Sequence, residues 1–267
     1  MDSALRALGL PESAVVEPAA GGASASAWKV RADGNQYVLR LSDSARLTTG
    51  RLSAMAAARV AGLPVPDVVR RSSTALGEAV LLSWLPGVPL AQVLVKSPGT
   101  ARDLGYAMGA IQRRLHQVTA PEDVRAVITD PDHPFAAGRG IPELPDGAVL
   151  LHLDWHPLNI LVNPASLEIT GIVDWDNARR GHPLLDLART SSILTVEPSL
   201  DALSAELHSV VEPFREAWAD GYGPEARNIP AECHLWAGRV MLADLEARHE
   251  PAALESLRRW TAGWMAG

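Results

Sequence analysis

Residues 152–176, HLDWHPLNILVNPASLEITGIVDWD, place histidine, aspartate and asparagine side chains in a run of leucine, isoleucine, valine and tryptophan. Acids and amides are unusual in so apolar a segment, and their presence is explained if they converge on a charged ligand. The first candidates for a site are six of its polar residues, His152, Asp154, His156, Asn159, Asp174 and Asp176.

Three of these residues have the spacing that phosphoryl transfer needs. Asn159 lies five residues after Asp154, and Asp174 follows fifteen residues later. The reaction requires one carboxylate to take a proton from the acceptor hydroxyl, and an amide and a second carboxylate to hold Mg²⁺. Asp154 follows the apolar run VLLHL, and Pro157 prevents a regular helix through the Asp154–Asn159 pair. Asp174 ends the run ITGIV, where a carboxylate can reach into a cleft.

The composition is that of a soluble globular protein. The chain has 267 residues, enough for one large domain or two small lobes, and is 47% hydrophobic and 21% charged. Its net charge of −7 argues against nucleic acid as the main partner, because phosphate binding wants a basic face. Cys233 is the only cysteine, so no internal disulfide is possible.

The residues show no targeting or membrane signal. The start, MDSALRALGLPESAVV, lacks a basic region followed by an apolar core, so we expect no signal peptide. No uncharged apolar run approaches the roughly 20 residues of a membrane span. We therefore expect a cytoplasmic protein without a membrane partner.

The first third of the chain predicts a sheet and one helix. Residues 15–41 are expected to form three short strands, with Asp33-Gly34-Asn35 as the second turn. In YVLRL, Val38 and Arg40 share one face of the strand. Residues 47–61 predict an alanine-rich helix that Gly62 ends. Two further strands are predicted from VPDVVR and EAVLLSWL.

After Pro86-Gly87, the expected lobe boundary, the chain turns helical. One helix face is predicted by the 4, 3, 4 spacing of Leu104, Met108, Ile111 and Leu115. We expect a loop region over residues 121–147, three short strands over 148–176 and helices from about 184 onward. The layout is a small sheet-rich lobe, 1–86, followed by a larger helical lobe, 87–267.

Four segments resemble the aminoglycoside phosphotransferase and choline kinase family, the small-molecule branch of the kinase-like fold. HLDWHPLNILV looks like its catalytic loop, and GIVDWDNARRGHPLLDLA is similar to its metal-binding segment and the following helix. LLSWLPGVPL resembles its inter-lobe hinge, and AGLPVPDVV the end of its N-lobe helix. The matches run in order from about residue 18 to 190. The resemblance implies an α+β, two-lobed protein-kinase-like fold with an antiparallel sheet in the N-lobe and a mostly helical C-lobe.

The resemblance also implies a role for each polar residue of the opening stretch. Asp154 would be the catalytic base. Mg²⁺ would be held by Asn159 and Asp174. Structural support of the catalytic loop would come from His152, His156 and Asp186. Asp176 stays open between an indirect role at the metal and a turn.

The phosphoryl donor would be ATP or GTP, which the residues do not distinguish. Arg40, on the strand YVLR, stands where kinases carry a basic residue for the α- and β-phosphates, and arginine can hold phosphate bidentately. The stretch AAGGASAS could cover phosphates with backbone N–H groups or form a plain hairpin tip, through Gly21, Gly22 and Ser24. Recognition of the base is expected from backbone groups of the hinge, Ser83, Trp84 and Leu85.

One departure from the family concerns the partner of Arg40. The N-lobe helix usually carries a glutamate for this cation, and counting back from Gly62 puts that position near Arg51. No aspartate or glutamate lies between Asp43 and Gly62. Either another carboxylate pairs with Arg40, or phosphate alone orients it.

The acceptor is expected to be a small molecule with a hydroxyl group, bound by the C-terminal helices. Residues 190–267 contain 12 acidic and 6 basic residues, which suits a polyamine such as an aminoglycoside, although the acids could be solvated helix faces. Macrolides, choline-like alcohols and sugars are alternative acceptors. We expect the tryptophans of this region to be core rather than a macrolide pocket, namely Trp218, Trp236, Trp260 and Trp264.

Two other readings compete with an antibiotic-resistance O-phosphotransferase. His152, Asp154 and His156 alternate, so on an extended strand they would point one way and could bind zinc in a metallohydrolase. The missing helix glutamate is the only support for a pseudokinase that binds nucleotide without turnover. A protein kinase is disfavoured, because Trp175-Asp176 follows Asp174 where a protein kinase has Phe-Gly.

Overall fold

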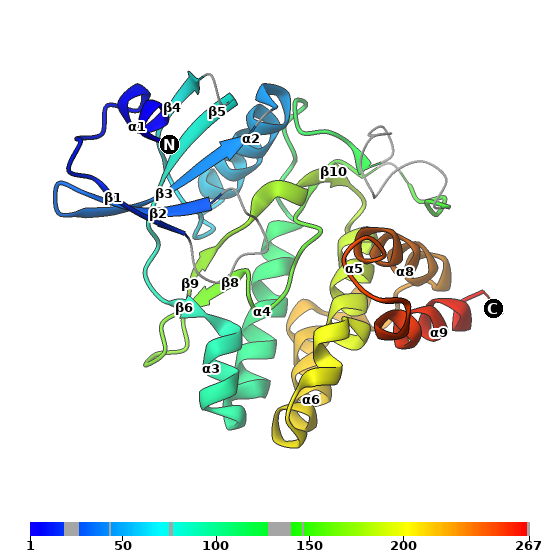
Figure 1. Ribbon diagram of the computed structural model, residues 1–267. Helices are drawn as coiled ribbons and strands as arrows, with labels where there is room; N and C mark the ends of the chain where they lie inside the picture. The colour runs from blue at the N-terminus through cyan, green and yellow to red at the C-terminus, as the bar shows by residue number, and fades with distance from the viewer. Residues whose placement is uncertain (19–26, 43, 75–76, 128–139, 146, 266–267) are drawn as a thin grey trace.

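The computed structural model describes residues 1–18, 27–42, 44–74, 77–127, 140–145 and 147–265. A sheet-rich N-terminal lobe is followed by a larger helical lobe, with the two termini on opposite lobes (Figure 1). This is the α+β, two-lobed fold that the sequence predicts.

The N-terminal lobe is built on a five-stranded antiparallel sheet of order β1-β2-β3-β5-β4. Asp33 and Gly34 have φ of 51° and 76° at the tight β2–β3 turn, as the Asp-Gly pair predicts. The strands are β1 (Val15–Pro18), β2 (Ala27–Ala32), β3 (Asn35–Ser42), β4 (Val68–Thr74) and β5 (Gly77–Ser83).

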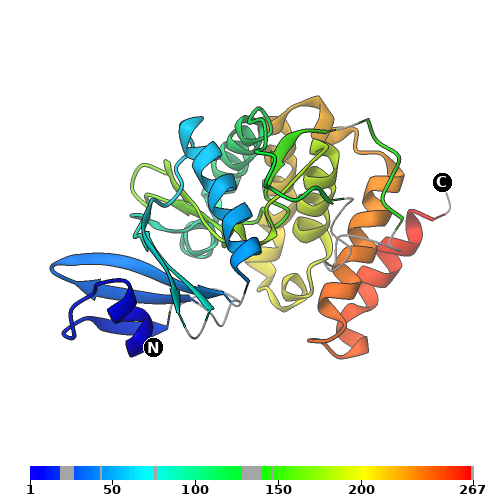
Figure 2. The ribbon, with the colours of Figure 1, turned by 90° about the horizontal axis from the view of Figure 1, so that it is seen from above.

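The two faces of this sheet are covered by different helices. α1 (Asp2–Ala7) packs on one face, where Leu39 and Leu41 of β3 join its hydrophobic cluster. On the other side, α2 (Ala45–Val60) lies between the sheet and the helical lobe (Figure 2). Val38 packs into the cluster that contains the buried face of α2, so Arg40, two residues on, shares this side of the strand.

The chain crosses to the second lobe at Gly87, where φ is +108°. A Cβ atom there would lie 2.5 Å from Thr170 Oγ1 and 2.7 Å from Val162 O, so only glycine fits this crossing. Thr170 Oγ1 also donates a hydrogen bond to Pro86 O at 2.6 Å. The crossing thus lies directly against the strands that carry the chemistry of the opening stretch.

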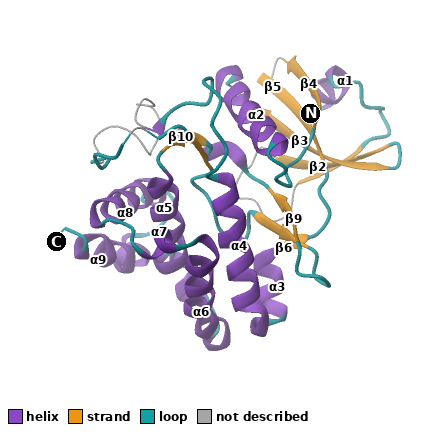
Figure 3. Ribbon diagram, turned by 180° about the vertical axis from the view of Figure 1, so that it is seen from behind, coloured by secondary structure: helices purple, strands orange, loops and turns teal. Residues whose placement is uncertain are grey.

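Helices form most of the second lobe (Figure 3). The predicted helix over Leu104 to Leu115 is α4, and all four of its periodic apolar residues are buried. In order, the helices are α3 (Leu90–Lys96), α4 (Ala101–Leu115), α5 (Pro183–Val196), α6 (Ala205–Tyr222), α7 (Pro224–Arg227), α8 (Ala231–Leu245) and α9 (Glu255–Gly263). Short 3-10 turns are η1 (Pro98–Thr100), η3 (Trp175–Asn177), η4 (Pro198–Ala202) and η5 (Pro251–Leu254). Over the described residues, no helix has the length and apolar character to cross a membrane.

Two small sheets are formed by strands from residues 88–181. One has the order β6-β8-β9 and the other pairs β10 with β7, all antiparallel. The strands are β6 (Val88–Pro89), β7 (Val149–Leu151), β8 (Ile160–Val162), β9 (Ile169–Ile172) and β10 (Arg179–Gly181). Three of them, β7, β8 and β9, are the short strands predicted over residues 148–176.

Helices α4 and α6 cross at very short distance because both carry glycine at the contact. A Cβ atom on Gly109 would lie 2.0 Å from Trp218 O, and one on Gly221 would lie 2.0 Å from Tyr106 O. Gln112 of α4 is fully buried there and links three elements, since it donates to Thr190 Oγ1 at 2.9 Å and accepts from Trp218 Nε1 at 2.8 Å. This closely packed helix pair contacts the loop that follows β7, since Trp155 of that loop donates to Met108 O of α4.

Candidate active site

The backbone leaves β7 through a left-handed residue. β7 ends at Leu151, and Leu153 has φ of +61°, a conformation that is costly for a residue with a branched side chain. Two anchors hold it. Trp155 is fully buried and donates from Nε1 to Met108 O of α4 at 3.2 Å. The second anchor is Asp186.

Asp186 connects α5 to the backbone of the loop. Its Oδ1 accepts from the Leu153 N–H at 2.7 Å, and its Oδ2 accepts from the His152 N–H at 3.1 Å. His116 Nε2 lies 2.9 Å from the same Oδ2. Burial opposes its ionisation, but the His116 hydrogen bond and the charges of His116 and His152 keep its pKa below the usual value. Asp186 makes the contacts that a bracing role needs.

His152 is enclosed beneath the loop. It is fully buried, and its ring makes edge contacts with Trp155 and Trp175 at centroid distances of 5.5 and 5.0 Å. Burial lowers its pKa, and Nε2 donates to Val173 O at 3.0 Å. His152 therefore joins the loop that carries Asp154 to the segment that carries Asp174.

Asp154, His156 and Asn159 form one cluster at the surface of the loop. Asn159 Nδ2 donates to Asp154 O at 2.9 Å and to Asp154 Oδ2 at 3.1 Å. His156 Nε2 lies 3.4 Å from Asp154 Oδ1, while its Nδ1 accepts from the Leu158 N–H at 3.3 Å. Because the amide nitrogen of Asn159 faces Asp154, its oxygen is the atom left to bind a cation.

Asp154 is held as a carboxylate. Burial favours its neutral form, but a hydrogen bond from His156 and the charges of His156, His152 and Arg189 outweigh burial and lower its pKa to about 2. A base with so low a pKa orients a hydroxyl proton rather than removing it early in the reaction. Its side chain is 27% exposed, so it is accessible to a substrate.

Asp174 follows β9 and adjoins Asn159. The Val173 N–H donates to Asn159 O at 2.9 Å, which sets the two segments side by side. Asp174 has φ of +60° at the start of η3. Its carboxylate and the Asn159 amide are oxygen donors of the kind that Mg²⁺ prefers with several waters retained. This donor set fits magnesium, which would supply charge neutralisation to the phosphates when bound.

Arg40 has two carboxylate partners, which resolves the alternative left open by the sequence. Its Nη1 lies 3.1 Å from Asp174 Oδ1, and its Nη2 pairs with Asp176 Oδ2. Arg51 Nη1 contacts the other oxygen of Asp176 at 2.6 Å. The position expected for a helix glutamate thus carries an arginine, and the acid comes from η3 instead. Orientation of Arg40 by phosphate alone is not needed.

The other predicted nucleotide residues are only partly described. Gly21, Gly22 and Ser24 lie outside the described residues. At the hinge, the Ser83 N–H donates to Asp67 O at 2.9 Å, and Lys29 Nζ lies 4.3 Å from the centroid of the partly exposed Trp84 ring. Leu85 packs toward Gly171, where a Cβ atom would lie 2.8 Å from Leu85 Cδ1.

The zinc site required by the metallohydrolase reading does not form. His152 points to Val173 O, whereas His156 faces Asp154, because the left-handed Leu153 breaks the extended strand that the reading assumed. Among the residues that the structure describes, no cluster of three or more histidine, cysteine, aspartate or glutamate side chains could hold a metal ion.

Two arginines at the site, one partly buried and one buried, were not predicted from the sequence. Arg51 is described above, and its side chain is only 13% exposed. Arg189, in α5, is 3% exposed, and its charge acts on Asp154 and Asp186. Nothing in the helical pattern PLLDLART marks Arg189 as a site residue. For Arg51 the signal was present, since it replaces the expected acid.

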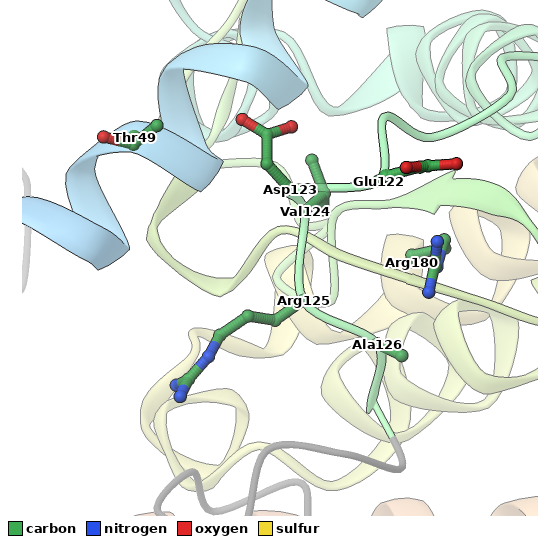
Figure 4. Close-up of a pocket in the computed structure, with 7 residues that line it drawn as sticks. All are labelled: Thr49, Glu122, Asp123, Val124, Arg125, Ala126 and Arg180. Carbon is green, nitrogen blue, oxygen red and sulfur yellow. The ribbon is translucent and has the colours of Figure 1, made fainter.

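A cavity of about 470 Å³ adjoins α2 on the side of the second lobe (Figure 4). Asp123 points toward α2 and accepts a hydrogen bond from Ser53 Oγ at 2.5 Å. None of Asp154, Asn159 and Asp174 lines the cavity, so it is not the chemical centre. The lining residues carry both signs of charge and are Thr49, Glu122, Asp123, Val124, Arg125, Ala126 and Arg180.

The acids and tryptophans of the C-terminal region have mostly structural contacts. Trp218 and Trp236 are almost fully buried, as expected for core residues, while Trp260 and Trp264 are half-buried beside His234. Several acids form exposed ion pairs on helix faces, which agrees with the solvated alternative for those residues. These pairs are Glu212–Arg215, Glu216–Arg102, Asp220–Arg227, Asp244–Arg248 and Glu246–Arg258.

Comparison with known proteins gives a family match and several similar folds. A model of the phosphotransferase enzyme family matches residues 15–139 and 136–236. No curated protein matches the chain. Among solved structures, an aminoglycoside-3'-phosphotransferase of type VIII is 20% identical, with a TM-score of 0.57 and coverage of 99% of this chain and 98% of that one.

Two further structures have the same fold. Aminoglycoside phosphotransferase APH(3'')-Id from Streptomyces rimosus is 18% identical, with a TM-score of 0.59 and coverage of 90% of this chain and 95% of that one. A thermostable mutant of APH(4)-Ia, in ternary complex with ADP and hygromycin B, is 16% identical, with a TM-score of 0.60 and coverage of 98% and 95%. These similarities confirm the predicted fold class.

Proposed function

This chain belongs to the phosphotransferase enzyme family, and we propose that it transfers the γ-phosphoryl group of ATP or GTP to a hydroxyl group of an aminoglycoside-type acceptor. The observation that carries this proposal is the contact between the loop of Asp154 and Asn159 and the segment of Asp174. The bound ADP and hygromycin B of the APH(4)-Ia structure support the choice of donor and acceptor class.

Each residue of the cluster has a proposed task. Asp154 accepts the hydrogen bond of the acceptor hydroxyl, orients it for in-line attack and takes its proton. Mg²⁺ would be held by Asn159 and Asp174, and Arg40 would contact the donor phosphates. His152, His156 and Asp186 hold the loop in position.

The same proposal assigns the nucleotide and the acceptor to different lobes. Residues 1–86 bind the nucleotide, with Gly21, Gly22 and Ser24 over the phosphates and the backbone of Ser83, Trp84 and Leu85 at the base. Residues 87–267 carry the chemistry and the acceptor. An acidic acceptor surface would favour a polyamine, because each ammonium group gains from a nearby carboxylate.

A nucleotide-consumption screen tests the proposal. ATP and GTP are each offered with Mg²⁺ and a panel of aminoglycosides, macrolides, choline-like alcohols and sugars. We expect turnover with an aminoglycoside, and Asp154→Ala should lower it by roughly 10²–10⁴-fold while nucleotide binding is kept. Turnover only with another acceptor class would replace the proposed substrate. Unchanged turnover in Asp154→Ala would refute the catalytic assignment.

Magnesium dependence has its own test. Calorimetry with Mg²⁺ and a non-hydrolysable nucleotide should show binding to the wild type and none to Asp174→Ala. Asp244→Ala, which alters an exposed ion pair outside the cluster, is the matched control and should bind normally.

A further inference from the structure

Arg40, Arg51 and Asp176 form a three-residue ion cluster that the proposed chemistry does not use in full. One carboxylate serves two arginines, with Oδ2 on Arg40 and Oδ1 on Arg51. Both arginine side chains are largely buried, at 10% and 13% exposure, whereas that of Asp176 is 39% exposed. Two guanidinium groups on one carboxylate leave a net positive charge, and the Asp174 carboxylate, 3.1 Å from Arg40 Nη1, balances it.

Asp176 is poorly suited to hold a metal itself. Each of its oxygens already faces an arginine, so binding a cation would break one of these pairs. Asp174 differs, since among the residues that the structure describes only its Oδ1 contacts an arginine, which leaves its Oδ2 for a cation. The two aspartates, two residues apart, therefore have separate tasks.

A metal ion held by Asp174 would compete with Arg40 for the charge of that carboxylate. Arg40 would then keep its pair with Asp176, and its Nη1 would turn to another anion. A nucleotide phosphate beside the metal is such an anion, and charge-assisted contacts of this kind are among the stronger hydrogen bonds in proteins.

We propose that Asp176 is a positioning residue that orients Arg40 for the donor phosphates, and that Arg51 holds Asp176 in place. This inference rests on the proposed function. Arg40 belongs to β3 and Arg51 to α2, while Asp176 belongs to η3 of the other lobe. The orientation of Arg40 therefore depends on contact between the lobes, and α2 lies where the two meet (Figure 2).

Affinity for the Mg²⁺–nucleotide is the first measurement. Asp176→Asn keeps the shape of the side chain but removes its charge. We expect the Kd for a non-hydrolysable nucleotide, and the KM for ATP, to rise by about 10- to 100-fold, the loss of one charge-assisted contact. The turnover number should change much less. Asp220→Asn, which alters an exposed pair with Arg227, is the control and should leave both constants unchanged.

Moving the negative charge from position 176 to position 51 shows whether Asp176 orients Arg40 or only stabilises the η3 turn. Arg40 and Arg51 contact the same carboxylate, so a glutamate at position 51 would lie close to Arg40. Adding Arg51→Glu to Asp176→Asn should recover at least a threefold part of the lost affinity. If Asp176 only stabilises the turn, Arg51→Glu adds a further loss, and the proposal fails.

A double-mutant cycle gives a second test that does not depend on the swap. If Asp176 acts through Arg40, Asp176→Asn should have almost no further effect on Kd in the Arg40→Ala background. Additive losses would overturn the proposal. Melting temperatures of all variants show whether any has lost its fold. A wild type that binds no nucleotide overturns the proposed function as well, whereas normal binding by Asp176→Asn overturns this inference alone.

Discussion

Replacing Asp186 with alanine should destabilise the protein by about 3–5 kcal/mol. The carboxylate is fully buried and accepts from two backbone N–H groups, those of His152 and Leu153, beside the His116 ring. Leaving one buried donor unsatisfied costs roughly 1–3 kcal/mol. The three groups that lose their partner are the two N–H groups and His116 Nε2, and together they could cost more than the predicted loss of about 3–5 kcal/mol. Water that enters the space of the lost carboxylate should satisfy some of them.

The loss is large beside the stability of a typical domain, which is about 5–15 kcal/mol. Leu153 adds to it, because its left-handed backbone is held by the hydrogen bond to Asp186 Oδ1. Without that acceptor the residue should relax toward ordinary β geometry and carry Asp154 with it. Turnover should therefore fall even at temperatures where the variant is folded.

Urea unfolding at pH 7 measures the effect, with circular dichroism to follow helix content. Asp220→Ala removes an exposed carboxylate paired with Arg227 and should cost at most about 1 kcal/mol. Since the pKa of Asp186 is lowered in the folded state, its stabilisation is present above the unfolded-state pKa of about 4 and is lost as pH falls below it. A loss below about 1 kcal/mol for Asp186→Ala would refute the bracing role.

Three other predictions concern separate parts of the molecule. With a pKa of about 2, the Asp154 carboxyl should remain ionised at pH 4 and above, and a ¹³C NMR titration midpoint near 5 would contradict this. Gly109→Ala should destabilise the α4–α6 crossing by about 1–3 kcal/mol or more in urea unfolding, while Gly99→Ala, which meets no atom within 4 Å, should be nearly neutral. Burial lowers the pKa of His234 to about 4, so stability should fall as pH drops from about 6.5 toward 4, and His234→Phe should remove that part of the fall; an unchanged pH dependence would count against it.

Local patterns predicted most of the architecture, because they depend on residues that are neighbours in sequence. The alternation in YVLRL predicted that Val38 and Leu39 lie on opposite faces of the strand, and in the structure Val38 packs toward α2 and Leu39 toward α1. The 4, 3, 4 spacing of apolar residues identified α4. By contrast, α1 and α3 have six and seven residues, too few for a periodic pattern to stand out.

The ion pairs of the site could not be predicted from local sequence patterns. Arg40 meets its carboxylate partners 134 and 136 residues further along the chain. Local spacing carries no information on such pairs, so the sequence could only state that an acid was missing from α2. Arg189 was missed for a related reason, since a buried arginine in an apolar helix gives no periodic signal for the charge it faces.

The geometry at Arg40 explains why the cation of this site is arginine and not lysine. One nitrogen of the guanidinium faces Asp174 and another faces Asp176, so a single planar group spans two carboxylates. A lysine ammonium presents one compact charge. It could contact both carboxylates only through less directional hydrogen bonds. The fork also allows one contact to be exchanged for a phosphate while the other is kept. In the proposed complex, a metal on Asp174 and a nucleotide on Arg40 would bind together, and Asp176 and Arg51 would keep the orientation of the arginine.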